Sequence, residues 1–176
     1  MSTPLYRSET RSVPIPQLPS VLRNALLTHA DTKKLKLVKA HAWVTTRENP
    51  ASTTMFGRLF KKRANSADAD AVHDMVLVVH ETHLLVGTSG ARRGTSILSL
   101  PLLVATATRG SLLAARMQTR AVDLPGDDDG LTISGFPGDA GNPGTYFMGL
   151  GAGAAAEACV DAVLAAVAAA KTPSPT

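Results

Sequence analysis

Three histidines near one short polar stretch are the first residues whose type and spacing could do chemistry. His80 and His83 stand three apart in the string His-Glu-Thr-His, and His73 precedes them. Imidazoles that converge across a turn can hold a metal ion, but the zinc-protease motif places its two histidines four apart on a helix. We therefore expect no metal site and interpret His80 and His83 as exposed residues of a turn.

Two further stretches carry ligand-type residues at spacings that do not fit a known site. Asp127–Asp129 and Gly130 are rich in carboxylates, which Ca²⁺ prefers, but the alternating ligands and distal Glu of an EF-hand are missing. Gly149, Gly151 and Gly153 precede a predicted helix, as glycines do in phosphate-binding loops, yet no Lys-Ser/Thr pair follows them. We interpret the first stretch as an acidic turn and expect no nucleotide at the second.

No side chain stands in a recognisable nucleophile arrangement. Cys159, the single cysteine, lies among alanines of a predicted helix, where it is either a small buried residue or a free surface thiol. Ser89 and Ser99 have no paired base in a hydrolase motif. The sequence therefore predicts no catalytic residue, no cofactor and no metal. One cysteine also excludes an internal disulfide, which fits a reducing compartment.

Charge is distributed unevenly along the 176 residues, whose formal net charge is +4. Residues 1–63 contain 12 Lys and Arg against 3 Asp and Glu (12 − 3 = +9), and residues 64–176 contain 6 against 11 (6 − 11 = −5). The positive half could face a phospholipid surface or an acidic protein, or the lysines could simply be solvated. Aromatic residues make up only 4% of the chain, which argues against nucleic-acid binding by base stacking.

The chain contains no predicted membrane span or signal peptide. Its most apolar stretch, the Ala-rich segment 152–170, is interrupted by Glu157 and Asp161. Residues 1–19 lack a basic start followed by an apolar run. We expect a cytoplasmic protein, either free or peripheral at a membrane.

The predicted elements form one domain over residues 20–171, between a flexible Pro-rich arm (1–19) and a tail (172–176). A helix is predicted at 20–30, because Ser20 offers an N-cap and apolar residues recur on one face. A polar loop over 47–71 contains a stretch at 55–60 that is apolar enough to form a short strand or a helical turn. The other predictions are strands at 35–46, 72–79, 84–88, 95–100, 102–108, 131–136 and 145–150, a strand extension at 111–122, and a helix at 152–170.

Three segments together resemble the pleckstrin-homology (PH)-like domain superfamily, of the bacterial or adaptor type. They are Val76–Val86, Thr95–Thr108 and Tyr146–Val167, which match a hairpin, an apolar strand passage and a last strand running into a helix. The resemblance implies an α+β, mainly β fold. It is a partial barrel of about seven antiparallel strands over residues 35–150, capped by one C-terminal helix, with a short N-terminal helix in addition.

The resemblance also implies a site for lipid phosphates. Lipid-binding members use basic residues on the first strand and in the loop that follows it, and arginine and lysine suit phosphate oxygens well. The loop here is longer than usual and also contains Asp68, Asp70 and Asp74. The residues carried over are Lys39, Arg47, Arg58, Lys61, Lys62 and Arg63.

Three functions remain open at this point. The first is a non-enzymatic recruitment module that docks on a protein partner, since barrel edges and the groove beside a C-terminal helix suit added peptides. The second is peripheral binding to anionic lipid or a phosphoinositide through the basic loop 58–63. The third is a small β-barrel ligand carrier or enzyme, which would require a polar-lined internal cavity. The sequence leaves the partner and the oligomeric state open.

Overall fold

The computed structural model describes residues 6–50, 63–65, 67–110, 130–137 and 143–172. A five-stranded antiparallel sheet has the order β1-β2-β3-β4-β5, and a three-stranded antiparallel sheet has the order β6-β7-β8. The first comprises β1 (Arg7–Val13), β2 (His41–Glu48), β3 (Val72–Val79), β4 (His83–Gly90) and β5 (Gly94–Pro101). The second comprises β6 (Thr106–Arg109), β7 (Gly130–Pro137) and β8 (Pro143–Gly149).

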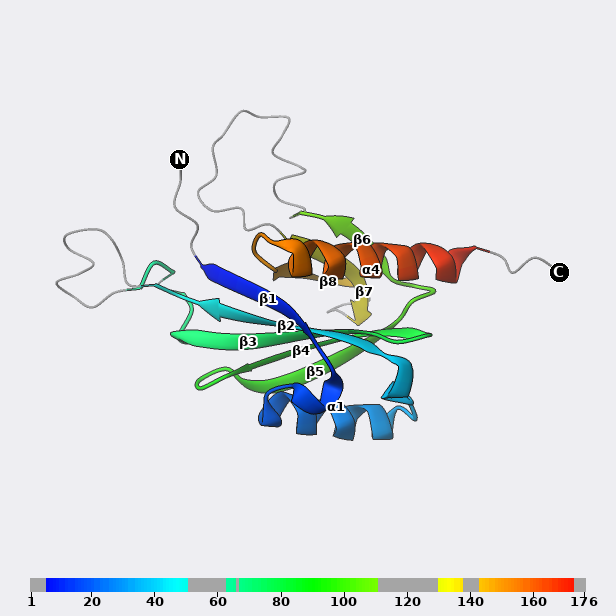
Figure 1. The fold of residues 1–176 in the computed structure, drawn as a ribbon, viewed down its shortest axis with the longest axis horizontal. Helices are drawn as coiled ribbons and strands as arrows, with labels where there is room; N and C mark the ends of the chain where they lie inside the picture. The colour runs from blue at the N-terminus through cyan, green and yellow to red at the C-terminus, as the bar shows by residue number, and fades with distance from the viewer. Residues whose placement is uncertain (1–5, 51–62, 66, 111–129, 138–142, 173–176) are drawn as a thin grey trace, which may run out of the picture.

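Two helices cover the two faces of the larger sheet. Figure 1 shows α1 (Ser20–Thr32) below it, and α4 (Ala154–Lys171) together with the three-stranded sheet above it. Short 3₁₀ turns, η1 (Ile15–Gln17) and η2 (Leu37–Lys39), lie on either side of α1 in sequence. The predicted mainly β class with a C-terminal and an N-terminal helix is confirmed.

Burial of both sheet faces explains why each central strand contains consecutive apolar residues, as in Ala42–Val44, Met75–Val79 and Leu84–Val86. In β3, Met75 and Leu77 point into an inner core shared with α4 and the smaller sheet. Their neighbours Val76 and Val78 point into an outer core under α1. Since successive strand residues face opposite sides, a sheet buried on both faces has continuous apolar runs instead of alternation.

The outer core depends on one face of α1. Leu22, Leu26 and Ala30 recur every four residues and are all buried. The helix ends with Lys34 in the left-handed region (φ 57°), and the Leu35 N–H donates to the Ala30 carbonyl over 2.8 Å. This 6→1 bond is that of a Schellman cap, a common helix ending.

The prediction of a flexible arm over residues 1–19 is wrong for residues 7–17, which the structure describes as β1 and η1. Residues 7–13 form β1, which pairs with β2 from Arg7 opposite Glu48 to Val13 opposite Ala42. The Thr10 hydroxyl donates to the Leu150 carbonyl over 2.7 Å and so ties β1 to the segment before α4. Backbone pairing, not side-chain hydrophobicity, orders this edge strand, and the nearby prolines lie outside it.

Several element boundaries differ from those predicted. The strand expected at 35–46 is β2 at 41–48, because Leu35 and Leu37 reach the outer core from the turn before it. The strand expected at 102–108 shortens to β6, since residues 102–105 form a turn. The C-terminal helix begins at Ala154, not 152, because Gly151 and Gly153 have φ of 72° and 132°. The predictions for 55–60 and 111–122 fall outside the described residues.

Candidate functional site

Two charged surfaces lie at opposite ends of β2. The first, which we call the Asp68–Arg93 cluster, contains Tyr6, Asp68, Asp70, His73 and Arg93. Arg93 Nη2 lies 2.6 Å from both carboxylate oxygens of Asp68, and Arg93 Nε lies 2.8 Å from Asp70 Oδ2. The Tyr6 hydroxyl donates to Asp68 Oδ2 over 2.6 Å. These bonds join the chain before β1, the segment before β3 and the β4–β5 turn.

Backbone groups complete the cluster. The Asp70 N–H donates to Asp68 Oδ1 over 3.0 Å, and the Arg92 N–H donates to Asp70 Oδ1 over 2.7 Å. Asp68 and Asp70 side chains are only 9% and 1% exposed. Two nearly buried carboxylates are thus satisfied by one guanidinium and by main-chain donors, which is how buried charge is normally tolerated.

The pKa values in the cluster shift in the directions that this pairing requires. Burial alone would raise the pKa of Asp68, but hydrogen bonds from Tyr6 and Arg93 outweigh it and hold the pKa well below its usual range. The pKa of Asp70 is lowered by its hydrogen bonds from Arg93 and from the Arg92 N–H. The pKa of Tyr6 is raised by burial and by its bond to Asp68. Both carboxylates are therefore ionised acceptors at neutral pH, not general acids.

His73 lies buried beneath the cluster. Its Nδ1 has no hydrogen-bond partner and lies 3.7 Å from Asp68 Oδ2. Burial and the nearby charge of Arg93 lower the pKa of His73 despite the carboxylates beside it. His73 is thus neutral at pH 7 and separated from His80 and His83, which lie on either side of the β3–β4 turn at the other end of β3. No group of three metal-ligating residues occurs in the part of the chain that the structure describes.

The sequence prediction treated His80 and His83 as exposed turn residues, and both are in fact half-buried. The Thr82 N–H and hydroxyl lie 3.2 Å from His80 Nδ1, and the hydroxyl lies 2.8 Å from His83 Nδ1. These bonds hold the turn and leave the two rings 6.2 Å apart at their centroids.

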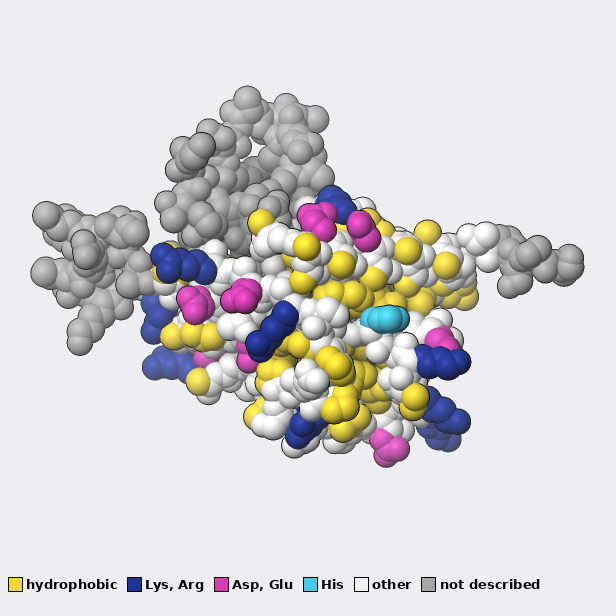
Figure 2. Space-filling model, in the orientation of Figure 1, with side chains coloured by type: hydrophobic (Ala, Val, Ile, Leu, Met, Phe, Trp, Pro, Cys, Tyr) yellow, Lys and Arg dark blue, Asp and Glu magenta, His cyan; other side chains and the backbone are white. Residues whose placement is uncertain are grey.

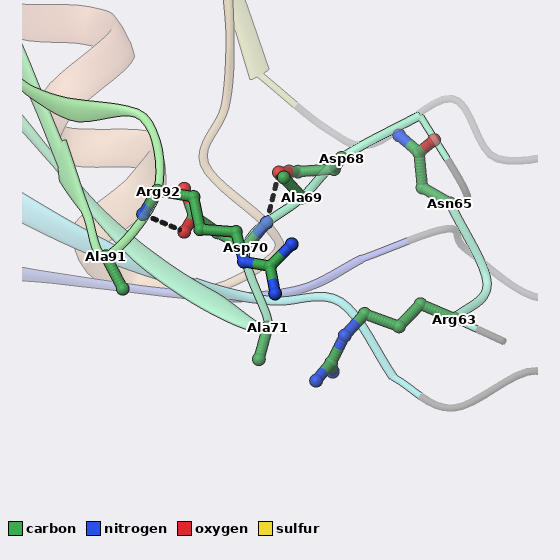
Figure 3. Close-up of a pocket in the computed structure, with 8 residues that line it drawn as sticks. All are labelled: Arg63, Asn65, Asp68, Ala69, Asp70, Ala71, Ala91 and Arg92. Carbon is green, nitrogen blue, oxygen red and sulfur yellow. Dashed lines mark hydrogen bonds between the residues drawn. The ribbon is translucent and has the colours of Figure 1, made fainter. Parts of the chain in front are cut away.

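A hollow of 570 Å³ opens beside the Asp68–Arg93 cluster. Figure 3 shows the side chains of Arg63 and Arg92 extending toward it, with Asn65 and the two aspartates on its wall. Arg63 also donates to the Asn49 carbonyl over 3.0 Å. The hollow therefore combines two cations with carboxylates that are already neutralised by Arg93.

Of the predicted phosphate-binding residues that the structure describes, Lys39 is separated from Arg47 and Arg63 by the length of β2. Arg47 is 9% exposed and its guanidinium carbon lies 4.0 Å from the centre of the Tyr6 ring, a cation–π contact. Lys39, expected on the first strand, is the last residue of η2, before the start of β2. Because eight strand residues span about 25 Å, Lys39 is far from Arg47 and Arg63 at the other end. Arg58, Lys61 and Lys62 lie outside the described residues.

Apart from Lys39, the second charged surface consists of residues that the sequence analysis did not identify as part of a site. We call it the lysine loop: Lys33, Lys34, Lys36, Val38 and Lys39, between the end of α1 and β2. All five side chains are exposed, and Val38 is 94% exposed. Figure 2 shows basic side chains gathered at this end of the molecule. The signal available in the sequence was the alternation of lysine with apolar residues in KKLKLVK.

The positive charge of the lysine loop also lowers the pKa values of two histidines near it. Burial lowers the pKa of His29 on α1, and the charge of Lys33 lowers it further. The pKa of His83 is lowered by burial, by His80 and by Lys33. The positive potential at this end therefore disfavours further protonation there.

A groove of 390 Å³ lies between the C-terminal end of α4 and the start of β2; we call it the α4 groove. Its apolar wall consists of Val79, Leu102, Ala166, Ala169 and Ala170, and its polar rim of Lys39, His41, His80 and Glu81. Small alanines on this part of α4 leave the space open, since larger side chains would fill it.

The other residues considered for catalysis, Cys159 and Ser99, have surroundings that suit a structural role. Cys159 is fully buried in the inner core, and burial raises its pKa to about 12, so it is a packed thiol and not a nucleophile. His29 Nε2 and Ser99 Oγ lie 2.9 Å apart, but no carboxylate of the described chain is hydrogen-bonded to His29. The acidic residues 127–129 fall outside the described ranges.

Comparisons with known proteins assign no family. No family model, no curated protein and no solved structure matches the chain. Of the helices in the described part of the chain, none is both long enough and apolar enough to cross a bilayer. The class that the structure defines is a mainly β protein with two antiparallel sheets and a C-terminal helix.

Proposed function

We propose that this protein is a non-enzymatic recruitment module with a PH-like architecture that docks on a protein partner. The order of elements supports the architecture: strands β2 to β5 in one sheet, β6 to β8 in a second, then α4. This is the order that the resemblance implies, with β1 and α1 added before it. The N-terminal additions cover one edge and the outer face of the larger sheet.

The α4 groove is the observation that carries the docking role. Its wall is apolar while its rim holds Lys39, His41, His80 and Glu81. Binding sites for peptides and small ligands commonly join an apolar concavity to a few polar groups that fix orientation. An apolar side chain of a partner peptide fits the wall, and a neighbouring carboxylate fits the Lys39 side of the rim.

The surroundings of the reactive residue types support a non-enzymatic role. A catalytic nucleophile requires a base within reach and a third group that orients the base. Cys159 is buried with a raised pKa, and Asp68 and Asp70 are bonded to Arg93. Apolar side chains from both sheets and α4 pack against one another in the inner core.

An Ala169→Arg variant tests the docking role, because it fills the groove from an exposed helix position. Ala168→Arg is the matched control: it is also exposed on α4 but does not line the groove. We expect affinity capture from the source cells, quantified by mass spectrometry, to recover a partner with the wild type and with Ala168→Arg, and to lose it with Ala169→Arg. Equal recovery with both variants would show that the partner does not use the groove.

A further inference from the structure

The lysine loop presents a single large apolar side chain at its tip. Side chains alternate along it: Leu35 and Leu37 pack against the outer core, whereas Lys36, Val38 and Lys39 are exposed. Val38 has the largest exposed fraction of the exposed large apolar residues in the described chain. Single exposed apolar residues are common on proteins, so the inference depends on what holds Val38 outward and on what surrounds it.

The backbone of the loop fixes Val38 in this position. The Schellman cap of α1 fixes the start of the loop through the bond from Leu35 N–H to the Ala30 carbonyl. The Ala40 N–H donates to the Leu37 carbonyl over 3.1 Å and closes η2 around Val38. Because Leu37 and Ala40 on either side pack against the outer core, Val38 cannot turn inward without displacing them.

The charges around Val38 are available for a partner. Among the residues that the structure describes, none of Lys33, Lys34, Lys36 and Lys39 forms an ion pair with a carboxylate. Lys34 also occupies a left-handed backbone position where glycine is the usual residue. The chain thus carries a fourth lysine in the loop at a conformational cost.

We propose that the lysine loop is a membrane-contact element that binds anionic phospholipid surfaces, with Val38 inserting among the headgroups and the lysines facing lipid phosphates. Lysine suits this role, since its long apolar stem can lie along the interface while the ammonium stays hydrated. Basic residues attract anionic leaflets additively, and a small inserted apolar side chain adds to the binding.

A bilayer fits the loop better than a protein partner does. Protein interfaces are depleted in lysine at their centres and depend on aromatic or arginine anchors, and the loop has neither. It also lacks a hollow and an arginine fork for one headgroup, so charge density, not headgroup identity, determines binding. This surface shares Lys39 with the rim of the α4 groove, and we therefore test it with lysines that do not line that groove.

Co-sedimentation with lipid vesicles tests the charge part of the proposal. The wild type should bind vesicles of phosphatidylcholine and phosphatidylserine mixed three to one, and not phosphatidylcholine alone, with weaker binding at higher salt. A Lys33→Gln/Lys36→Gln variant should lose about 25-fold in affinity, from about fivefold for each lysine. Arg7→Gln/Arg92→Gln is the matched control: it makes the same charge change at two exposed residues at the other end of β2, and it should bind as the wild type does.

A Lys61→Gln/Lys62→Gln variant, in the basic loop 58–63, decides between the two candidate lipid sites. If Lys61→Gln/Lys62→Gln loses binding and Lys33→Gln/Lys36→Gln does not, the basic loop 58–63 is the lipid site and the proposal is wrong. If the wild type ignores the anionic vesicles but binds poly-glutamate through the lysine loop, the surface recognises an acidic protein. The Ala169→Arg variant should bind vesicles normally, so failure of the docking proposal is distinguishable from failure of this one.

A fluorescent label at position 38 tests insertion directly. Because Cys159 is fully buried, a thiol-reactive dye on a Val38→Cys variant labels position 38 alone. An environment-sensitive dye there should brighten on anionic vesicles, whereas the same dye on an Asn24→Cys variant, exposed on α1, should not. Equal responses at both positions, or none at position 38, would overturn insertion. A Val38→Ser variant should bind about tenfold more weakly.

Discussion

The Asp68–Arg93 cluster and the lysine loop lie at opposite ends of β2 and use charge in opposite ways. In the cluster, one arginine neutralises two nearly buried carboxylates, and main-chain N–H groups satisfy the remaining oxygens. In the lysine loop, four exposed lysines surround an exposed valine and form no ion pair with any described carboxylate. Charge that is paired within the fold holds segments together, whereas charge left at the surface beside an apolar residue is free to bind something else.

Removing Arg93 should have the largest effect on stability. In an Arg93→Ala variant, Asp68 and Asp70 lose their charged partner while remaining largely buried, and we expect a loss of about 2–3 kcal/mol in unfolding free energy. Denaturant unfolding followed by the fluorescence of Trp43, the single buried tryptophan, measures it. Arg92→Ala is the matched control, because that exposed neighbour should change stability by less than about 0.5 kcal/mol.

Acidification should weaken the same end of the molecule in two stages. A lowered pKa means that the unfolded chain binds protons before the folded one, so stability falls as pH falls. Proton uptake at His73 in the unfolded chain should lower the stability below about pH 6.5. Proton uptake at Asp68 should lower it further below about pH 4. Unfolding free energies measured from pH 7 to pH 3 should therefore decrease, and the gap between the wild type and Arg93→Ala should narrow below about pH 4. A constant gap would show that the Asp68–Arg93 pair does not stabilise the fold.

At the other end, one substitution should improve stability while weakening binding to anionic vesicles. Lys34→Gly places glycine at the left-handed cap position and should raise the unfolding free energy by about 1 kcal/mol. The same change removes one cation of the lysine loop and should weaken binding to anionic vesicles. Lys34→Gln keeps a residue with a side chain at the left-handed position. It should therefore weaken vesicle binding without raising the unfolding free energy. A stabilised Lys34→Gly variant with unchanged vesicle binding would remove Lys34 from the proposed contact.

The smallest effect on stability is expected for the double lysine variant, although its effect on vesicle binding is large. Lys33→Gln/Lys36→Gln should change the unfolding free energy by less than about 0.5 kcal/mol, because both side chains are exposed and form no ion pair with a described residue. Thermal unfolding measures this beside the vesicle assay. A large loss of stability would mean that the lysine loop, like the Asp68–Arg93 cluster, is a structural element, and the contrast between the two ends would disappear.

Much of the fold could be predicted because burial leaves a clear pattern. Residues Met75–Val78 and the positions Val160, Val163 and Val167 are apolar because each side chain enters a core, and the strand and helix predicted there are present. The segment Arg7–Val13 carried no such signal. Its side chains are mostly polar, and only the edge of β2 provides its hydrogen bonds. The resemblance placed Lys39 beside Arg47 and Arg63, but β2 separates them.

By itself, the sequence determined the strands and helices in which apolar side chains face a core and polar side chains face solvent. It also determined the absence of an internal disulfide and the excess of positive charge in residues 1–63. Only the tertiary structure decided which of those charges are available. Arg47 is covered by Tyr6, Arg93 is bonded to two aspartates that lie 23 and 25 residues before it, and four lysines are left exposed around Val38. The physical reason is that pairing and exposure depend on distances across strands, and those distances are fixed only when the sheet forms.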